Sequence, residues 1–203
     1  MNQHEELIEA RDQIVNDYGA LVPVREITSN VSAFPGGSGF LDGKPGERKV
    51  MFVLHNYDGS DDLNKPENYK SAFWLTLYTY IDGAGIPRDE AFVTNVYMGA
   101  RPGKANGEMA SFGGENFTAQ CMEFFDKQVS IINPSLVIMC GNFANVALAS
   151  WHGRPKVLVA HPSSNRDANK RIERAAPWMT AIRSALAETH SATVIAPAKA
   201  STS

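Results

Sequence analysis

A chain of 203 residues with 43% hydrophobic and 20% charged side chains is long enough for one domain with a sizeable core. Its formal net charge of −3 argues against a general polyanion-binding protein, although a local basic patch on a nucleic-acid enzyme stays open. The sequence has no apolar run long enough to span a bilayer, and its first residues do not resemble a signal peptide, so we expect a cytoplasmic protein.

The two cysteines, Cys121 and Cys140, stand in apolar stretches, and neither belongs to a Cys-x-x-Cys pair. We expect buried free thiols rather than a disulfide, a zinc site or an iron–sulfur cluster. The sequence therefore predicts no cofactor and no bound metal.

Segments with helical periodicity alternate with short apolar runs along the chain. The first segment predicts a helix over 5–18 that ends at Gly19. Residues 33–46 are rich in Gly and Pro and predict a surface loop, because Pro45 stands where a phosphate-binding loop has Ser or Thr. The sequence then predicts strands over 51–54, 91–97, 136–140 and 157–160, and helices from 68 or 71 to 82, over 116–132, over 142–150 and over about 169–188, the last broken or restarted at Pro177.

The alternation of strands and helices predicts an α/β fold with parallel strands and right-handed crossovers. We expect three layers, α/β/α, around a central, mainly parallel four-stranded sheet. Residues 1–190 show no linker that would divide them and predict a single domain. The small residues of 191–203 predict a disordered tail.

Polar residues close three of the predicted strands. The cluster His55-Asn56-Tyr57-Asp58 follows the first strand, Asn95 lies in the second, and His161 follows the fourth. In open α/β sheets, ligands bind just beyond the carboxyl ends of the strands. The three strand ends are therefore the candidate site.

Several motifs at these positions resemble one known family. They are Ala84-Gly85-Ile86-Pro87-Arg88, Phe92-Val93-Thr94-Asn95-Val96, Arg101-Pro102 and His161-Pro162-Ser163. Together they resemble the uracil-DNA glycosylase superfamily, most closely its bacterial and archaeal branch that usually carries an iron–sulfur cluster. The match runs without a gap over 50–103 and covers about 50–166.

The resemblance implies roles for three residues around an extruded base. His161 matches the histidine that donates a hydrogen bond to the leaving base, and Asn95 matches the asparagine that reads the base edge. Tyr69 falls where the family has a Phe that stacks on the base. The structural alternatives are a histidine packed after a strand, a turn-forming asparagine and a core aromatic.

The first motif departs most from the family pattern. His55-Asn56-Tyr57-Asp58-Gly59 falls where the branch has Gly-Glu-Ala-Pro-Gly. Asn56 occupies the position of the Glu and can orient water, but it cannot act as a base. Tyr57 replaces a small residue and would contact the base or fill the pocket. Asp58 is the nearby carboxylate that would substitute for the missing Glu.

Two further departures concern the cluster and the DNA contacts. Ala100 stands where a cluster cysteine is expected, so the resemblance implies no iron–sulfur cluster here. Beyond His161 the chain is basic, and we expect Ser163, Arg166 and Lys170 to contact the DNA backbone. An ordinary charged helix face is the alternative explanation for the basic run.

The resemblance implies a hydrolase of DNA repair that removes uracil or a related damaged base from single-stranded or damaged duplex DNA. We expect it to be a monomer. It would cleave the N-glycosidic bond with His161, Asn56 and Asp58. The alternative is a catalytically inactive protein of the same fold that binds a base, nucleotide or nucleic acid. A third hypothesis is a metal-assisted nucleotide hydrolase that uses Asp58, Asp61 and Asp62.

Overall fold

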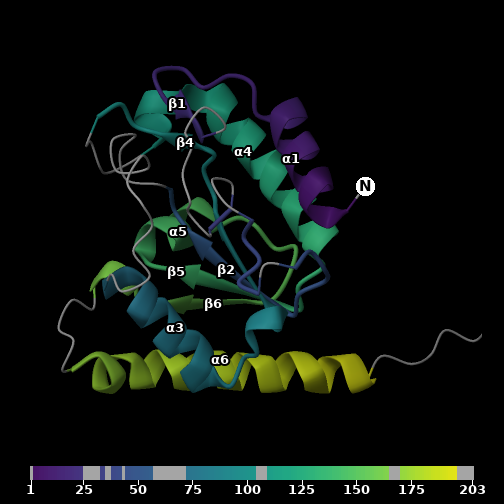
Figure 1. The fold of residues 1–203 in the computed structure, drawn as a ribbon, viewed down its shortest axis with the longest axis vertical. Helices are drawn as coiled ribbons and strands as arrows, with labels where there is room; N and C mark the ends of the chain where they lie inside the picture. Colours follow the sequence, from purple (N-terminus) through teal and green to yellow (C-terminus); the bar gives the residue numbers. More distant parts are fainter. Residues whose placement is uncertain are drawn as a thin grey trace, which may run out of the picture.

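The computed structural model describes residues 2–24, 33–34, 38–42, 44–56, 72–103, 109–164 and 170–195, with the backbone alone for 190–195. A four-stranded sheet lies between two layers of helices (Figure 1). Helices α1 (Gln3–Ile14) and α4 (Ala110–Ile132) cover one face, and α3 (Ala72–Ala84) and α6 (Arg171–Ile195) cover the other. This confirms the predicted three-layer α/β/α fold.

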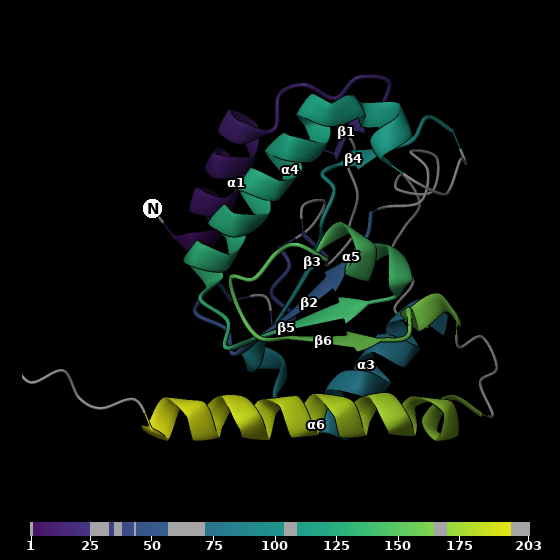
Figure 2. The ribbon, with the colours of Figure 1, turned by 180° about the vertical axis from the view of Figure 1, so that it is seen from behind.

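The sheet has the strand order β3-β2-β5-β6, and every neighbouring pair is parallel. Its register pairs Leu54 with Asn95, and Cys140 with Val159. Figure 2 shows β2, β5 and β6 pointing the same way, so their carboxyl ends share one edge of the sheet. The strands are β2 (Val50–Leu54), β3 (Ala91–Asn95), β5 (Leu136–Cys140) and β6 (Lys156–Val159).

The core consists of two layers of apolar side chains, one on each face of the sheet. Met51 and Val53 of β2 pack toward α1 and α4, whereas Phe52 and Leu54 pack toward α3 and α6. All residues of β2, β3 and β5 are buried, as expected for parallel strands covered on both faces. The short helix α5 (Asn142–Ala147) connects β5 to β6.

Some element boundaries differ from the sequence-based expectation. Helix α4 begins at Ala110 rather than 116, with a break at Gly114, whose φ is 78°. The prediction of a break at Pro177 is wrong, because α6 is continuous through it. Pro177 lies on the exposed side, where water can satisfy the carbonyl of Glu173 that loses its helical partner.

Four short elements among the described residues were not predicted. The strands β1 (Val22–Pro23) and β4 (Gly99–Ala100) form a small antiparallel pair. Single turns of 3₁₀ helix, η2 (Arg88–Glu90) and η3 (Pro162–Ser164), lie before β3 and after β6. The backbone of 191–195, which the sequence assigns to the tail, is helical, and the rest of that tail lies outside the described residues. None of the helices in the described ranges is long and apolar enough to cross a membrane.

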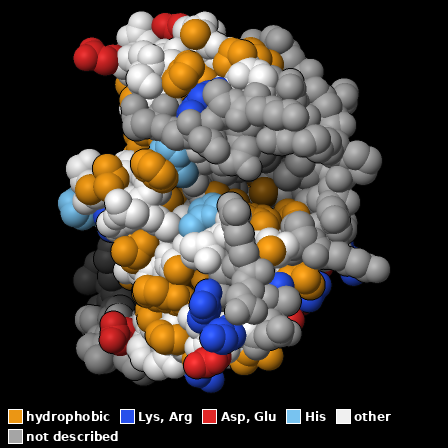
Figure 3. All heavy atoms as spheres, turned by 90° about the vertical axis from the view of Figure 1, so that its left-hand side faces the viewer, with side chains coloured by type: hydrophobic (Ala, Val, Ile, Leu, Met, Phe, Trp, Pro, Cys, Tyr) orange, Lys and Arg blue, Asp and Glu red, His pale blue; other side chains and the backbone are white. Residues whose placement is uncertain are grey.

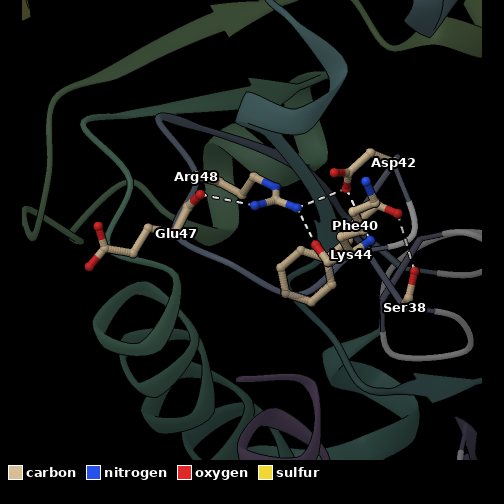
Figure 4. Close-up of polar contacts among 6 residues, drawn as sticks. All are labelled: Ser38, Phe40, Asp42, Lys44, Glu47 and Arg48. Atoms are coloured by element: carbon tan, nitrogen blue, oxygen red, sulfur yellow. Dashed lines mark hydrogen bonds and ion pairs between the residues drawn. The ribbon is translucent and has the colours of Figure 1, made fainter. Parts of the chain in front are cut away.

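The described part of the Gly-rich loop is organised by Arg48 (Figure 4). Its guanidinium donates to the Asp42 carboxylate at 2.8 Å, to the Glu47 carbonyl at 3.0 Å and to the Lys44 carbonyl, and lies over the Phe40 ring. Phe40 in turn pairs with Phe92 of β3. This part of the loop therefore covers the outer edge of β3, which would otherwise present unpaired backbone groups.

Candidate functional site

Three predicted site residues lie at the carboxyl edge of the sheet. Asn56 follows β2, Asn95 ends β3, and His161 follows β6. Because β3 and β6 are the outer strands, three strand spacings place the backbones of Asn95 and His161 about 14 Å apart. Both side chains can therefore reach one ligand only if it lies over the ends of β2 and β5.

Figure 3 shows the molecule from this edge of the sheet. Histidine side chains appear near the middle of the face, beside hydrophobic side chains, and Lys and Arg side chains gather below them. The face therefore combines apolar, imidazole and cationic groups.

A hydrogen bond within its own turn selects one tautomer of the neutral His161 ring. The backbone N–H of Ser163 donates to His161 Nδ1 at 3.2 Å. Nδ1 must therefore accept, and in the neutral ring the proton sits on Nε2. The residue before it is also anchored, because the Tyr80 hydroxyl donates to the Ala160 carbonyl at 3.2 Å. Burial raises the pKa of Tyr80, which keeps this hydroxyl protonated.

Two residues from other elements pack against His161. Gly141, at the end of β5, has a φ of 93°, and a Cβ built on it would lie 2.8 Å from the His161 Cβ. Only glycine allows this close approach without a shift of the backbone. The half-buried Phe73 ring of α3 lies 6.0 Å from the His161 ring, measured between centroids. Phe73 is thus an aromatic surface beside the imidazole, although it also packs against the core.

Asn95 presents a buried acceptor. Its side-chain Nδ2 donates to the Phe34 carbonyl at 3.3 Å, and the residue is only 1% exposed. Its Oδ1 has no hydrogen-bond partner among the residues that the structure describes. Leaving a buried amide oxygen unsatisfied costs about 1–3 kcal/mol. Such an oxygen is open to a hydrogen bond from a water or from a ligand.

The first motif is arranged around His55. Its Nδ1 lies 2.5 Å from the Asn56 Oδ1, so the ring donates and the amide oxygen accepts. His55 is buried between Tyr97 and Phe143, whose ring centroids lie 5.0 and 5.1 Å from its own. The half-buried Asn56 amide is therefore oriented by its neighbour.

Several predicted site residues lie outside the described ranges. These are Tyr57, Asp58, Asp61, Asp62, Tyr69 and Arg166. Their roles in stacking, water placement, metal binding and DNA contact stay predictions. Within the described ranges, no three His, Cys, Asp or Glu side chains are grouped to hold a metal ion.

Of the predicted DNA contacts, Ser163 contacts His161 directly, through its backbone N–H. Ser163 is half-buried in η3, and Lys170 is exposed at the start of α6. A cavity of about 200 Å³ lies between these elements and is lined by Tyr80, Ala160, Ser164, Arg174 and Trp178. It adds an exposed cation, Arg174, to the same side of the site.

Both cysteines are buried and free, as predicted. Burial raises the pKa of the Cys121 thiol and of the Cys140 thiol to about 12. The thiolate form, which acts as nucleophile or metal ligand, is therefore scarce at neutral pH.

The sequence interpretation missed the partners that orient the site. Phe34 reaches Asn95 from the Gly-rich loop, and Phe143 reaches His55 from α5. Neither pair is close in sequence, and no local motif marks it. Gly141 carried a usable signal, since a glycine directly after a buried strand often marks a close approach.

No family model matches this sequence, and no curated protein matches it significantly.

Proposed function

We propose that this protein is a base-excising N-glycosidase that removes uracil or a related damaged base from DNA. The observation that carries the proposal is that two groups suited to binding a base lie at the same edge of the sheet. One is the buried Asn95 oxygen, which has no hydrogen-bond partner among the described residues, and the other is the His161 imidazole with its proton on Nε2. The sequence resemblance assigns base-binding roles to these same two residues.

The proposed reaction breaks the bond between the base nitrogen and the sugar C1′. The bonding electrons leave with the base, which becomes an anion, and the sugar becomes an oxocarbenium cation. His161 stabilises the departing anion by donating from Nε2 to the base oxygen, where charge develops. Water then adds to C1′ and releases a proton, leaving an abasic sugar and a free base that takes up a proton.

Asn95 supplies the selectivity in this proposal. Its Oδ1 can accept a hydrogen bond but cannot donate one, and uracil presents an N–H donor at ring position 3 where cytosine presents a lone pair. A cytosine in the same pose would set two acceptors against each other and leave the buried oxygen unsatisfied. Discrimination of this kind reaches several orders of magnitude when the site is built around a buried polar group.

The remaining roles complete the proposed site. Asn56 and Asp58 place the attacking water near C1′, and Tyr69 and Tyr57 contact the base. Ser163, Arg166 and Lys170 contact the phosphates. The enzyme acts as a monomer in the cytoplasm. Its substrate is single-stranded or damaged duplex DNA, in which extruding the base costs the least free energy.

The proposal is tested by base release from uracil-containing single- and double-stranded oligonucleotides. We expect His161→Ala and Asn95→Ala each to lower the rate at least about tenfold, through lost stabilisation of the leaving base and lost base binding. The matched control is His152→Ala, an exposed histidine that precedes β6 and lies away from the carboxyl edge. Unchanged rates in both site variants would remove the basis of the proposal.

A second candidate is a protein of the same fold that binds a base, nucleotide or DNA without cleaving it. It is favoured by the first motif, where His55 donates to the Asn56 oxygen and so occupies part of the acceptor that would hold water. No base release from any uracil substrate, together with retained binding of uracil or uracil-containing DNA that Asn95→Ala abolishes, would select this candidate over the enzyme.

A further inference from the structure

A buried polar chain connects Asn95 to the interior of the protein. Thr94 and Gln128 are both fully buried, and the Thr94 hydroxyl donates to the Gln128 Oε1 at 2.7 Å. The Thr94 hydroxyl also lies 3.3 Å from the Phe34 carbonyl, which is the acceptor for Asn95 Nδ2. Gln128 of α4, Thr94 of β3 and the loop residue Phe34 thus form one polar cluster with the Asn95 amide.

The hydroxyl of Thr94 has one proton and more than one acceptor within reach. The distances from Thr94 Oγ1 are 2.7 Å to Gln128 Oε1, 3.3 Å to the Phe34 carbonyl and 3.5 Å to the Asn95 carbonyl. The shortest of these is the strongest hydrogen bond, so the proton points to Gln128. The Phe34 carbonyl is then left to the Asn95 amide.

The Phe34 carbonyl is itself fixed in place. Its backbone N–H donates to the Val93 carbonyl at 2.9 Å, and the fully buried ring packs against the rings of Phe92 and Phe124 at 6.1 and 5.9 Å between centroids. A rigid acceptor on one side of Asn95 decides which end of the amide faces the other side. Nδ2 turns to the carbonyl, and Oδ1 turns away from it.

We propose that Thr94 and Gln128 are positioning residues that act on the ligand through Asn95. Gln128 holds the Thr94 proton away from the Phe34 carbonyl, and that carbonyl then orients the Asn95 amide with its oxygen toward the ligand. The device selects ligands that present an N–H, such as a lactam edge of a base. The identity of the ligand rests on the proposed function, whereas the orientation of the amide does not.

Single and double substitutions distinguish a positioning role of Thr94 and Gln128 from a purely structural role. In Gln128→Leu the Thr94 proton turns to the Phe34 carbonyl, which then accepts from two donors and holds Asn95 Nδ2 less strongly. In Thr94→Val with Gln128→Leu the competing proton is gone, so Asn95 regains its partner. A purely structural role predicts the opposite, because the double variant loses more native contacts than the single one.

The function-independent measurement is NMR of the ¹⁵N-labelled full chain. The side-chain NH₂ signals of Asn95 are assigned by their loss in Asn95→Ala. We expect these protons to exchange with water at least about threefold faster in Gln128→Leu and to return to the wild-type rate in the double variant. Thr94→Ser keeps the hydroxyl and is the matched control that stays at the wild-type rate.

The activity measurement is the ratio of kcat/KM for uracil over cytosine in otherwise identical oligonucleotides. We expect Gln128→Leu to lower this ratio about three- to tenfold, because a loosened amide also presents its NH₂, and we expect the double variant to restore it. Gln128→Met, which keeps the side-chain volume, replaces Gln128→Leu if that variant does not fold.

The outcomes are distinguishable. Unchanged Asn95 exchange in Gln128→Leu would overturn the proposal, and it is also the result expected if the Gln128 amide is turned so that Nε2 donates to Thr94. A double variant no better than Gln128→Leu would overturn it as well. If the exchange rates behave as expected and wild-type protein releases no uracil, the positioning stands and the proposed glycosidase activity fails.

Discussion

Gly141 is the residue on which the placement of His161 depends most directly. Its φ of 93° and ψ of 164° lie in a region that side-chain-bearing residues rarely adopt, and its backbone N–H donates to the Val159 carbonyl at 2.8 Å. The missing side chain lets the turn after β6 approach β5. One residue thus satisfies a backbone requirement and a packing requirement together.

Gly141→Ala should lower base release at least about tenfold. The new Cβ would contact His161 and move its Nε2, and the strained backbone would cost about 1–3 kcal/mol of folding free energy. Gly85→Ala is the matched control, since Gly85 also has a positive φ, of 74°, but nothing lies within 4 Å of its added Cβ. Measuring kcat/KM and urea unfolding for both variants checks this. Equal activities would show that the contact with His161 does not matter.

His4 should make the protein less stable as the pH falls. Burial, and then the charge of Arg11, lowers the pKa of His4 below its ordinary 6.5, against a smaller opposite effect of Glu5. The unfolded chain therefore binds the proton more readily than the folded protein. The contribution of neutral His4 is present above pH 6.5 and is lost as the pH falls toward the folded-state pKa.

Urea unfolding at pH 7.5 and at pH 5.5 checks this expectation. Carboxylates also titrate toward acid, so the informative quantity is the difference between wild-type protein and His4→Gln. The free energy of unfolding should drop less in the variant than in the wild type over this interval. Identical drops would exclude a role for His4, which packs edge-on against Phe34 and Phe40.

At the scale of elements, Lys156 of β6 closes the carboxyl end of α5. Its ammonium donates to the carbonyls of Leu148 at 2.5 Å, Trp151 at 2.6 Å and Ala149 at 3.3 Å. The Leu148 carbonyl is at the C-cap of α5, where carbonyls lack helical partners and a cation also interacts favourably with the helix dipole; Ala149 and Trp151 lie in the segment that follows the helix. The same segment is tied to α4, because the Trp151 indole donates to Asp126 at 2.6 Å.

Lys156→Met should lower the free energy of unfolding by about 1–3 kcal/mol, because it keeps the aliphatic stem and removes the hydrogen bonds to three carbonyls. Lys127→Met is the matched control. Its ammonium is exposed and lies 3.7 Å from Glu6, a surface ion pair worth less than about 1 kcal/mol. Urea unfolding of both variants measures the difference, and a similar loss in each would argue against the cap.

At the scale of the whole molecule, a protein with a net charge of −3 can bind DNA only through a local concentration of cations. Lys170 precedes α6 and Arg174 lies in its first turn, and both are exposed. Arg174 lines the same cavity as Ala160 and Ser164, which flank the turn that bears His161. The apolar and imidazole groups of the carboxyl edge lie on the same face (Figure 3). Phosphate binding would therefore deliver a base to the candidate site.

DNA affinity should fall as the salt concentration rises, and each phosphate contact contributes to the slope of log K against log salt. We expect Lys170→Ala and Arg174→Ala each to weaken binding of single-stranded DNA and to reduce the slope of log K against log salt by about 0.7. Lys127→Ala, on the opposite helical layer, should leave the slope unchanged. Fluorescence anisotropy between about 50 and 200 mM salt measures all three. A wild-type slope in both α6 variants would place the DNA elsewhere.

The parts of the fold that local patterning controls were predictable. Apolar runs such as 51–54 and 136–140 are buried strands, and the periodicity of 116–132 is a helix, because the period of the side chains follows directly from the backbone geometry. Boundaries were less predictable. Pro177 does not interrupt α6, since packing against the sheet layer outweighs one lost hydrogen bond.

By itself, the sequence determined the α/β class, the parallel sheet and the presence of polar residues at the ends of three strands. Only the tertiary structure decided what those residues contact: the Phe34 carbonyl orients Asn95, Gln128 takes the Thr94 proton, and Gly141 admits His161. Local periodicity depends on neighbours along the chain. These contacts join residues far apart in sequence, and they depend on strand order and on how the helical layers pack, which no local pattern encodes.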